Sequence, residues 1–317
     1  MKKILITRKL IPSSEKRAAE FFNVKLNIED KLLTKEEIIK ESNSCDGILS
    51  SITDKFDHEV ISKLPESVKI ISNFAVGFGN IDVHAAKERN IVVTNTPDVL
   101  TDATADIAIL ILLGASRRAK EGMEWAKKKN WKWTADFLLG KELSGSRLGI
   151  LGMGRIGRAV AERARSFGMQ IHYHNRTRLN KNLEKDAVYH KSLEDLLSIS
   201  DFFSINCPAT KETKHIINKN TIKYFPNSAV ISNSARGDMI DDNAMVEALK
   251  SGKIFALGLD VYNGEPDIHP EYLTLPNVYV LPHLGSSTKK TRTAMADLAV
   301  SNIYEFFKNG VCKNIVN

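Results

Sequence analysis

The chain has 317 residues and a formal net charge of +7, with 43% of its residues hydrophobic and 26% charged. That length suffices for two domains with separate cores, and the composition is that of a globular protein rather than of a disordered or fibrous one. Lysine and arginine are spread along the whole chain, so the positive charge does not indicate a nucleic-acid partner. The densest basic group, residues 126–133, is interpreted as a solvated helix end with two anchoring indoles rather than a platform for single strands.

The sequence indicates neither a membrane segment nor a metal centre. The longest apolar run, residues 107–113, is far shorter than the ~20 residues that span a bilayer. The apolar part of residues 1–7 is too short for a signal peptide. Cys45, Cys207 and Cys312 form no Cys-x-x-Cys pair, which argues against a disulfide framework and against zinc. We therefore expect a cytoplasmic protein without a metal.

Residues 1–97 alternate short apolar runs with amphipathic stretches, which is typical of a parallel α/β sheet. In the stretch 34–42, Thr34 is a plausible helix N-cap and Glu37 completes a capping box. The expected strands of this first part are residues 4–7, 24–28, 47–51, 69–74 and 91–95.

A second α/β series follows a long helix expected at residues 101–129. Its seven expected strands are residues 148–152, 170–175, 187–190, 202–207, 229–234, 255–261 and 278–281. A last amphipathic helix, residues 286–307, has no evident place in this second sheet and is expected to return to the first domain.

The fold class predicted from this order is α/β, with two doubly wound parallel-sheet domains. A discontinuous substrate domain would comprise residues 1–97 plus 286–317, and a dinucleotide-binding Rossmann domain would comprise residues 98–285. We expect the ligands to bind in a cleft between the two domains.

A glycine-rich turn lies between a predicted strand and a predicted helix of the second domain. It reads Gly152, Met153, Gly154, Arg155, Ile156 and Gly157. In this context Gly152 permits a tight turn, Gly154 lets a pyrophosphate approach the backbone, and Gly157 lets the helix pack on the strand. The amides and the dipole at the helix start would hold the phosphates, so the motif predicts a bound dinucleotide.

Three polar residues follow predicted strands of the same domain, namely Arg236, Glu265 and His283. Because the carboxyl ends of parallel strands form one ligand-binding edge, all three are expected at one site. Arginine presents a fork to a carboxylate, histidine exchanges a proton near neutral pH, and a glutamate beside it fixes its tautomer and favours the imidazolium. Taken singly, each has an ordinary alternative: a turn-closing ion pair for Arg236, a solvated loop for Glu265 and a satisfied loop histidine for His283.

These residues belong to sequence blocks that resemble the D-isomer-specific 2-hydroxyacid dehydrogenases, most of all their glyoxylate and hydroxypyruvate reductases. The blocks are residues 76–82, 93–106, 233–237, 260–266 and 281–286. The resemblance implies a Rossmann domain, a flavodoxin-like substrate domain, and reduction of a small 2-oxo acid with NAD(P)H. It also implies that Arg236 orients the substrate, Glu265 assists and His283 donates the proton, while the amides of Val76 and Gly77 bind the substrate carboxylate.

Cofactor contacts implied by the resemblance lie on several loops of the Rossmann domain. Beyond the glycine motif they are Thr104, Asn175, Arg176, Thr177, Cys207, Pro208, Thr213, Ser234, Ala235, Arg236, Asp260, His283, Leu284 and Gly285. Cys207 has no base near it in the sequence and is interpreted as a packing residue rather than a nucleophile.

Alternatives to a glyoxylate or hydroxypyruvate reductase remain open. The family also contains nicotinamide-sensing corepressors, and its dehydrogenases include enzymes for 2-ketogluconate and 3-phosphoglycerate. The formate dehydrogenases carry glutamine at the position of Glu265, which argues against their chemistry. The intact residues Arg236, Glu265 and His283 favour an enzyme over a binding protein. The physiological direction of the reaction is not settled by the sequence.

The connection between the long helix and the first Rossmann strand is rich in aromatic residues. Trp125, Trp131, Trp133 and Phe137 lie there, followed by Leu138 and Leu139. So much apolar area is hard to bury within one Rossmann half, and tryptophan is enriched at interface centres. We therefore predict a homodimerisation arm, the alternative being an arm that folds back on its own domain.

The end of the second Rossmann strand indicates which cofactor is used. Asn175 stands where NAD-specific sites usually carry an acid for the ribose 2′-hydroxyl, and we expect Glu184 to be too far along the chain to turn back. Arg176 and Arg178 offer charge-assisted bonds to a 2′-phosphate, with Asn175 and Thr177 as neutral donors. These residues favour NADP(H), with NAD(H) as the alternative. The arginines could instead line an exposed turn.

Overall fold

The computed structural model describes residues 1–317, and its residue contacts divide the chain into two compact units. Unit 1 comprises residues 1–100 and 287–317, and unit 2 comprises residues 101–286. No helix in either unit combines the length and hydrophobicity needed to cross a bilayer.

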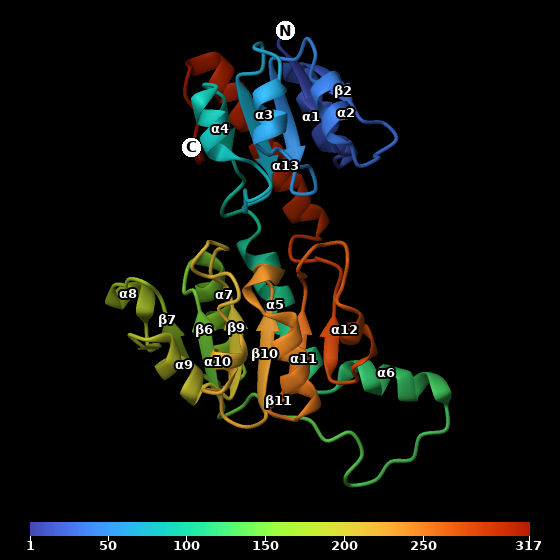
Figure 1. Ribbon diagram of the computed structural model, residues 1–317, viewed down its shortest axis with the longest axis vertical. Coiled ribbons are helices and arrows are strands. Elements are labelled where there is room, and N and C mark those ends of the chain that lie inside the picture. Colours follow the sequence, from blue (N-terminus) through green and yellow to red (C-terminus); the bar gives the residue numbers. More distant parts are fainter. The chain divides into compact units, whose positions relative to one another are not determined.

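Unit 1 is built on a five-stranded parallel sheet (Figure 1). Its strands are β1 (Lys3–Ile6), β2 (Asn23–Leu26), β3 (Gly47–Ser51), β4 (Ile70–Phe74) and β5 (Val92–Thr94). They lie in the order β2-β1-β3-β4-β5, the flavodoxin-like order. The predicted strands are confirmed to within two residues at each end, because short and mostly buried apolar runs mark most of them.

Helices cover both faces of the unit 1 sheet. They are α1 (Pro12–Phe21), α2 (Lys35–Glu41), α3 (His58–Lys63), α4 (Val83–Glu88) and α13 (Lys289–Asn309). Leu5 and Ile48 face a core shared with α2, α3 and α4, whereas Ile4 and Ile6 face a core that includes buried residues of α1 and α13. The capping box predicted at Thr34 and Glu37 is confirmed at the start of α2.

Unit 2 contains a seven-stranded parallel sheet in the order β12-β11-β10-β9-β6-β7-β8 (Figure 1). The strands are β6 (Arg147–Leu151), β7 (Gln170–His174), β8 (Val188–Tyr189), β9 (Phe202–Ile205), β10 (Ala229–Asn233), β11 (Ile254–Leu259) and β12 (Val278–Val280). This is the Rossmann order with a seventh strand added, and the direction of winding reverses between β6 and β9. The predicted α/β class and both parallel sheets are thus confirmed.

Two helical layers enclose the unit 2 sheet. Its helices are α5 (Thr101–Ser116), α6 (Ala119–Lys128), α7 (Arg155–Ser166), α8 (Lys181–Glu184), α9 (Leu193–Ile199), α10 (Lys219–Ile222), α11 (Asp242–Lys250), α12 (Pro270–Thr274) and the 3-10 turn η1 (Gly237–Met239). Buried residues of α5 and α7 fill one face, and those of α9, α10 and α11 fill the other. Gly258 of β11 lies so close to the α5 backbone that a Cβ there would collide with the carbonyl of Ile111.

The prediction of one helix over residues 101–129 is wrong, because the structure has two helices there. The chain turns at Arg118, which adopts a left-handed conformation at φ 55° and pairs with Glu121 through both carboxylate oxygens at 2.7 Å. The turn frees α6 from the core, and no residue of α6 is buried. The loop that follows α6 extends away from the body of unit 2 (Figure 1).

Candidate active site

The glycine motif lies at the reversal point of the unit 2 sheet. β6 ends at Leu151, and Gly152 follows at φ 93°, where any Cβ would collide with the backbone of Cys207 after β9. A Cβ on Gly157 would collide with the carbonyl of Gly152, so α7 packs directly on the turn. Gly154 has no atom near its missing Cβ, and it begins α7 without a side-chain cap. The amides at the start of α7 are therefore open to an anion.

Polar groups around this turn suit a dinucleotide. The Ser234 hydroxyl, just past β10, and the Asn206 carboxamide oxygen, just past β9, are buried without a hydrogen-bond partner. On the other side of β6, the Asn175 carboxamide oxygen accepts a 2.7 Å hydrogen bond from the amide of Met153, which ties the β7 end to the glycine turn. The open amides and unpartnered groups together fit a cofactor with phosphates and ribose hydroxyls.

Glu265 and His283 lie side by side in unit 2. His283 follows β12, and its Nδ1 lies 2.6 Å from Oε2 of Glu265, while Oε1 of Glu265 accepts the amide N–H of Tyr262 at 2.9 Å. Burial opposes ionisation of Glu265, but the hydrogen bond and charge of His283 and the Tyr262 amide outweigh it, so the pKa of Glu265 is lowered. The pair is thus an ionised carboxylate on one ring nitrogen, which leaves Nε2 free.

A second carboxylate holds the loop that carries His283. Asp260, directly after β11, accepts the amides of Leu284 and Gly285 at 2.7 and 2.8 Å, and the Thr104 hydroxyl donates to the Gly285 carbonyl at 3.2 Å. Burial raises the pKa of Asp260, against these two amide bonds. Both Asp260 oxygens are thereby occupied within the protein, which the sequence did not indicate. In this structure Asp260 positions the loop.

Arg236 follows β10 and is half-buried. It forms no hydrogen bond with Glu265 or His283, but the charge of Glu265 acts on it. Its Nη1 donates to the carbonyl of Ala235 at 2.6 Å. Burial lowers its pKa from the ordinary arginine value, while the charges of Glu265 and Asp238 oppose that shift. The next residue, Gly237, is pressed against the Tyr262 backbone, so no larger residue fits there. The guanidinium remains a cation with donors to spare for a carboxylate.

The other expected cofactor residues fall on loops at the carboxyl edge of the unit 2 sheet. Thr213 closes the loop after β9, because its hydroxyl accepts the Thr210 amide at 2.8 Å and donates to the Pro208 carbonyl at 3.0 Å. Burial raises the pKa of the Cys207 thiol to about 11, and its sulfur contacts that of Met239 at 3.8 Å. A thiol of this kind is a packing residue and a poor nucleophile.

Arg176 and Arg178 differ in their surroundings at the end of β7. Arg176 is exposed and forms no hydrogen bond or ion pair within the protein. Arg178 forms a bidentate pair with Glu184, at 2.9 Å for both bonds. The expectation that Glu184 lies too far along to turn back is therefore wrong. The one-turn helix α8 reverses the chain and returns this acid to the strand end.

Val76 and Gly77 belong to unit 1, in the loop after β4. The Asn95 side chain donates to the Val76 carbonyl at 2.8 Å, and the Asn73 side chain donates to the Gly77 carbonyl at 3.0 Å. The N–H groups of Val76 and Gly77 donate to nothing within the protein. Two free amides in a loop whose carbonyls are fixed by side-chain hydrogen bonds are suited to binding a carboxylate.

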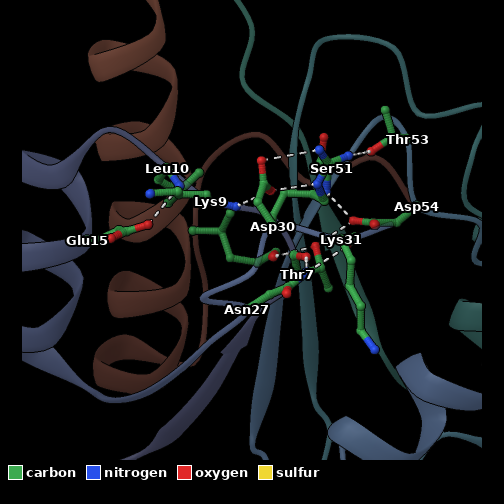
Figure 2. A network of polar contacts seen from close by, with 12 residues as sticks. Thr7, Lys9, Leu10, Glu15, Asn27, Asp30, Lys31, Ser51, Thr53 and Asp54 are labelled. Carbon is green, nitrogen blue, oxygen red and sulfur yellow. Dashed lines mark hydrogen bonds and ion pairs between the residues drawn. The ribbon is translucent and has the colours of Figure 1, made fainter. Parts of the chain in front are cut away.

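Neighbouring loops at the same edge of the unit 1 sheet are held by a network of polar contacts (Figure 2). Asp54 accepts the Thr7 hydroxyl at 2.5 Å and the Ser51 amide at 2.7 Å, and Asp30 accepts the Lys9 amide at 2.8 Å. Burial raises the pKa of Asp54. These bonds tie the loops after β2 and β3 to the loop after β1.

Comparisons with known proteins agree with these features. Residues 109–285 match the model of the D-isomer specific 2-hydroxyacid dehydrogenase, NAD binding domain. The glycerate dehydrogenase of Hyphomicrobium methylovorum is 42% identical over 301 residues, 94% of each chain. The glyoxylate reductase of Thermococcus litoralis is 39% identical, covering 99% of this chain and 96% of its own. An NADPH-dependent glyoxylate/hydroxypyruvate reductase from Sinorhizobium meliloti, solved with NADP and malonate, superposes with a TM-score of 0.89 at 33% identity and covers 99% of this chain and 96% of its own.

Proposed function

Since the chain belongs to the D-isomer specific 2-hydroxyacid dehydrogenases, we propose that it reduces glyoxylate or hydroxypyruvate with a nicotinamide cofactor. The product is the corresponding 2-hydroxy acid, in the D configuration where the new hydroxyl carbon is chiral. The observation that carries the proposal is the 2.6 Å contact between Glu265 and His283 at the carboxyl edge of the unit 2 sheet. Relatives named glyoxylate reductase and glycerate dehydrogenase, at 39% and 42% identity, support these substrates.

Arg236 binds and polarises the substrate in this proposal. A guanidinium stays protonated at any physiological pH and offers a planar fork that matches a carboxylate and the adjacent carbonyl oxygen. Its half-buried position strengthens that interaction, because fewer waters compete for the donors. The unpartnered amides of Val76 and Gly77 are proposed to bind the substrate carboxylate as well.

His283 is the proposed proton donor. Glu265 on Nδ1 fixes the ring and stabilises positive charge on it, so that Nε2 can give its proton to the oxygen that becomes the hydroxyl. Asp260 keeps the backbone of this loop in place through the amides of Leu284 and Gly285. Proton donation by a positioned acid is typically worth ~10² to 10⁴-fold in rate.

Unit 2 is the proposed dinucleotide-binding domain and unit 1 the proposed substrate domain. Gly154 and the open amides of α7 would hold the pyrophosphate, and the unpartnered Ser234 hydroxyl would meet the nicotinamide side. When bound, the reduced nicotinamide supplies a hydride to the carbonyl carbon of the substrate.

NADP(H) is the proposed cofactor, with NAD(H) as the alternative. No carboxylate is free at the end of β7 to bind a ribose 2′-hydroxyl, because Glu184 is engaged by Arg178. Arg176 is an exposed cation where a 2′-phosphate would lie. The Sinorhizobium relative is described as NADPH-dependent, which supports the same choice.

The test of the reaction is the oxidation of NADPH and NADH followed by absorbance with a panel of small 2-oxo acids. Wild type should turn over glyoxylate or hydroxypyruvate, and His283→Gln should lose about 100-fold or more in kcat. A His283→Gln turnover within about threefold of wild type would refute the proton-donor role. A panel without turnover would favour a corepressor-like binding protein instead.

A homodimer is the proposed assembly. The arm formed by residues 125–139 leaves Trp133 80% exposed, and Trp125 and Trp131 contact Phe137 within the arm. Exposed aromatic area of this extent is typical of an interface. Light scattering at micromolar concentration should report twice the 35.4 kDa chain mass, and Trp131→Ser with Trp133→Ser should lower it toward one chain. A monomeric wild type would exclude this role for the arm.

A further inference from the structure

A buried carboxylate lies beneath the turn that follows β7. The side chain of Glu184, the last residue of α8, is only 6% exposed. The chain reverses directly after it, at Lys185, which has φ 55°. Buried carboxylates in proteins are as a rule fully paired, so the partners of Glu184 indicate what it holds in place.

Three hydrogen bonds converge on this carboxylate. The Tyr173 hydroxyl donates to Oε1 at 2.7 Å, and Arg178 donates from Nε to Oε1 and from Nη2 to Oε2, both at 2.9 Å. Tyr173 is itself fully buried in β7, and its hydroxyl accepts the Leu179 amide at 3.1 Å. The hydrogen bonds from Arg178 and Tyr173 lower the pKa of Glu184. Burial, together with the hydrogen bond to Glu184, raises the pKa of Tyr173 to about 12. The turn after β7 is therefore anchored in the sheet through Glu184.

Arg178 is fixed on one edge and open on the other. Its guanidinium carbon also lies 5.6 Å from the centroid of the Tyr189 ring, so two contacts hold the group. Its side chain is nevertheless 60% exposed, and Nη1 has no partner in the protein. A guanidinium has five N–H donors, and the bidentate pair with Glu184 uses two of them. The others are accessible two residues past Arg176.

We propose that Glu184 is a positioning residue for cofactor selection, holding Arg178 so that its open edge binds the 2′-phosphate of NADP(H) beside Arg176. The inference rests on the proposed preference for NADP(H). A guanidinium already held in place loses less conformational freedom when it binds a phosphate, so its contribution to affinity is larger. The opposite role, in which Glu184 neutralises Arg178 and keeps it from the phosphate, predicts an increased preference for the 2′-phosphate in Glu184→Gln.

The test compares two ligands that differ only at the 2′ position. Calorimetry on the full chain measures Kd for adenosine 2′,5′-bisphosphate and for adenosine 5′-monophosphate, without any turnover. In Glu184→Gln the preference for the 2′-phosphate should fall about tenfold, while the affinity for the monophosphate stays within about twofold. Glu247→Gln is the matched control, because Glu247 is an exposed residue of α11 and the substitution makes the same change of charge.

Two further variants make the result independent of any loss of folding. Arg178→Lys keeps the charge at an exposed position but cannot form the bidentate pair, and it should lose the preference to a similar extent. Glu184→Gln combined with Arg178→Ala should lose no more than Arg178→Ala alone, since both act through one group. An unchanged or increased preference in Glu184→Gln, or an unchanged preference in Arg178→Lys, overturns the inference.

Failure of the underlying cofactor proposal has a different signature. In that case wild type itself binds the two ligands equally well, and Arg176→Ala binds them as wild type does. The inference about Glu184 is then wrong together with the NADP(H) preference. If Arg176→Ala loses the preference and Glu184→Gln keeps it, only the role of Glu184 is wrong.

Discussion

Replacing Glu265 with glutamine tests how much of the proposed proton donation depends on a charge. Glutamine keeps the shape of the side chain, and its carbonyl oxygen can still accept the Tyr262 amide. Its NH2 group then faces Nδ1 of His283, which must accept a hydrogen bond instead of donating one. The ring is left neutral, with its proton on Nε2, and a neutral imidazole is a far weaker acid than an imidazolium.

The expected size of the effect follows from the geometry of the pair. A hydrogen bond to a charged group contributes ~1.5–3 kcal/mol, and the 2.6 Å separation of Oε2 and Nδ1 indicates a charge-assisted bond. His283 and Glu265 are 36% and 32% exposed, so solvent screening reduces the figure to ~1.5–2 kcal/mol. At 1.36 kcal/mol for each factor of ten, kcat should fall roughly 10- to 30-fold.

The assay is the steady-state reduction of glyoxylate at pH 7. The KM for substrate should change little, because Glu265 is not proposed to bind it. Glu247→Gln serves as the control with the same change of charge. A kcat within about threefold of wild type would refute the reasoning.

Three other perturbations have defined outcomes. Arg176→Ala should lower kcat/KM for NADPH by about tenfold and leave that for NADH unchanged, and a wild-type preference for NADH of tenfold or more would contradict the NADP(H) proposal. Asp201 accepts two bonds from the Arg147 guanidinium, at 2.9 Å each, which lower its pKa. The contribution of Asp201 to the free energy of unfolding is therefore present above its ordinary pKa of about 3.9 and is lost as the pH falls through the lowered value. Urea unfolding should show that Asp201→Asn destabilises the protein by ~0.5–1 kcal/mol at pH 7 and by less at pH 3.5. Gly258→Ala should destabilise by ~2–3 kcal/mol, since the new methyl group collides with an α5 carbonyl, whereas Gly122→Ala, which meets no neighbour, should not destabilise.

Regular elements of this protein were largely readable from the sequence because their signals are local. The strand at residues 47–51 has the bounds that its apolar run predicts, and the cap at Thr34 follows from the identity of two residues. The order of strands and helices similarly determined the class of fold. Apolar runs and helix caps are properties of a few adjacent residues, so they can be recognised without knowledge of the rest of the chain.

The features that were missed depend on residues that the fold brings together and that no local sequence pattern links. Arg118 adopts a positive φ in a segment whose composition favours a continuous helix, and its pair with Glu121 is formed only after the turn. Glu184 reaches Arg178 because a single helical turn reverses the chain. Asp260 was expected to face the cofactor, yet its oxygens accept two amides of a loop more than twenty residues later. The amino-acid composition of a segment does not reveal such pairings.

The place of α13 in the fold has a consequence for synthesis on the ribosome. Its residues Ala296, Ala299, Val300 and Ile303 complete the core beneath Ile4 and Ile6, but the whole of residues 101–286 is translated between the two segments. Unit 2 is contiguous, so it can close its own core while the earlier-made sheet still has one apolar face open to water. We therefore expect residues 1–100 to complete their fold after residues 101–286, and to be exposed to chaperones during that interval.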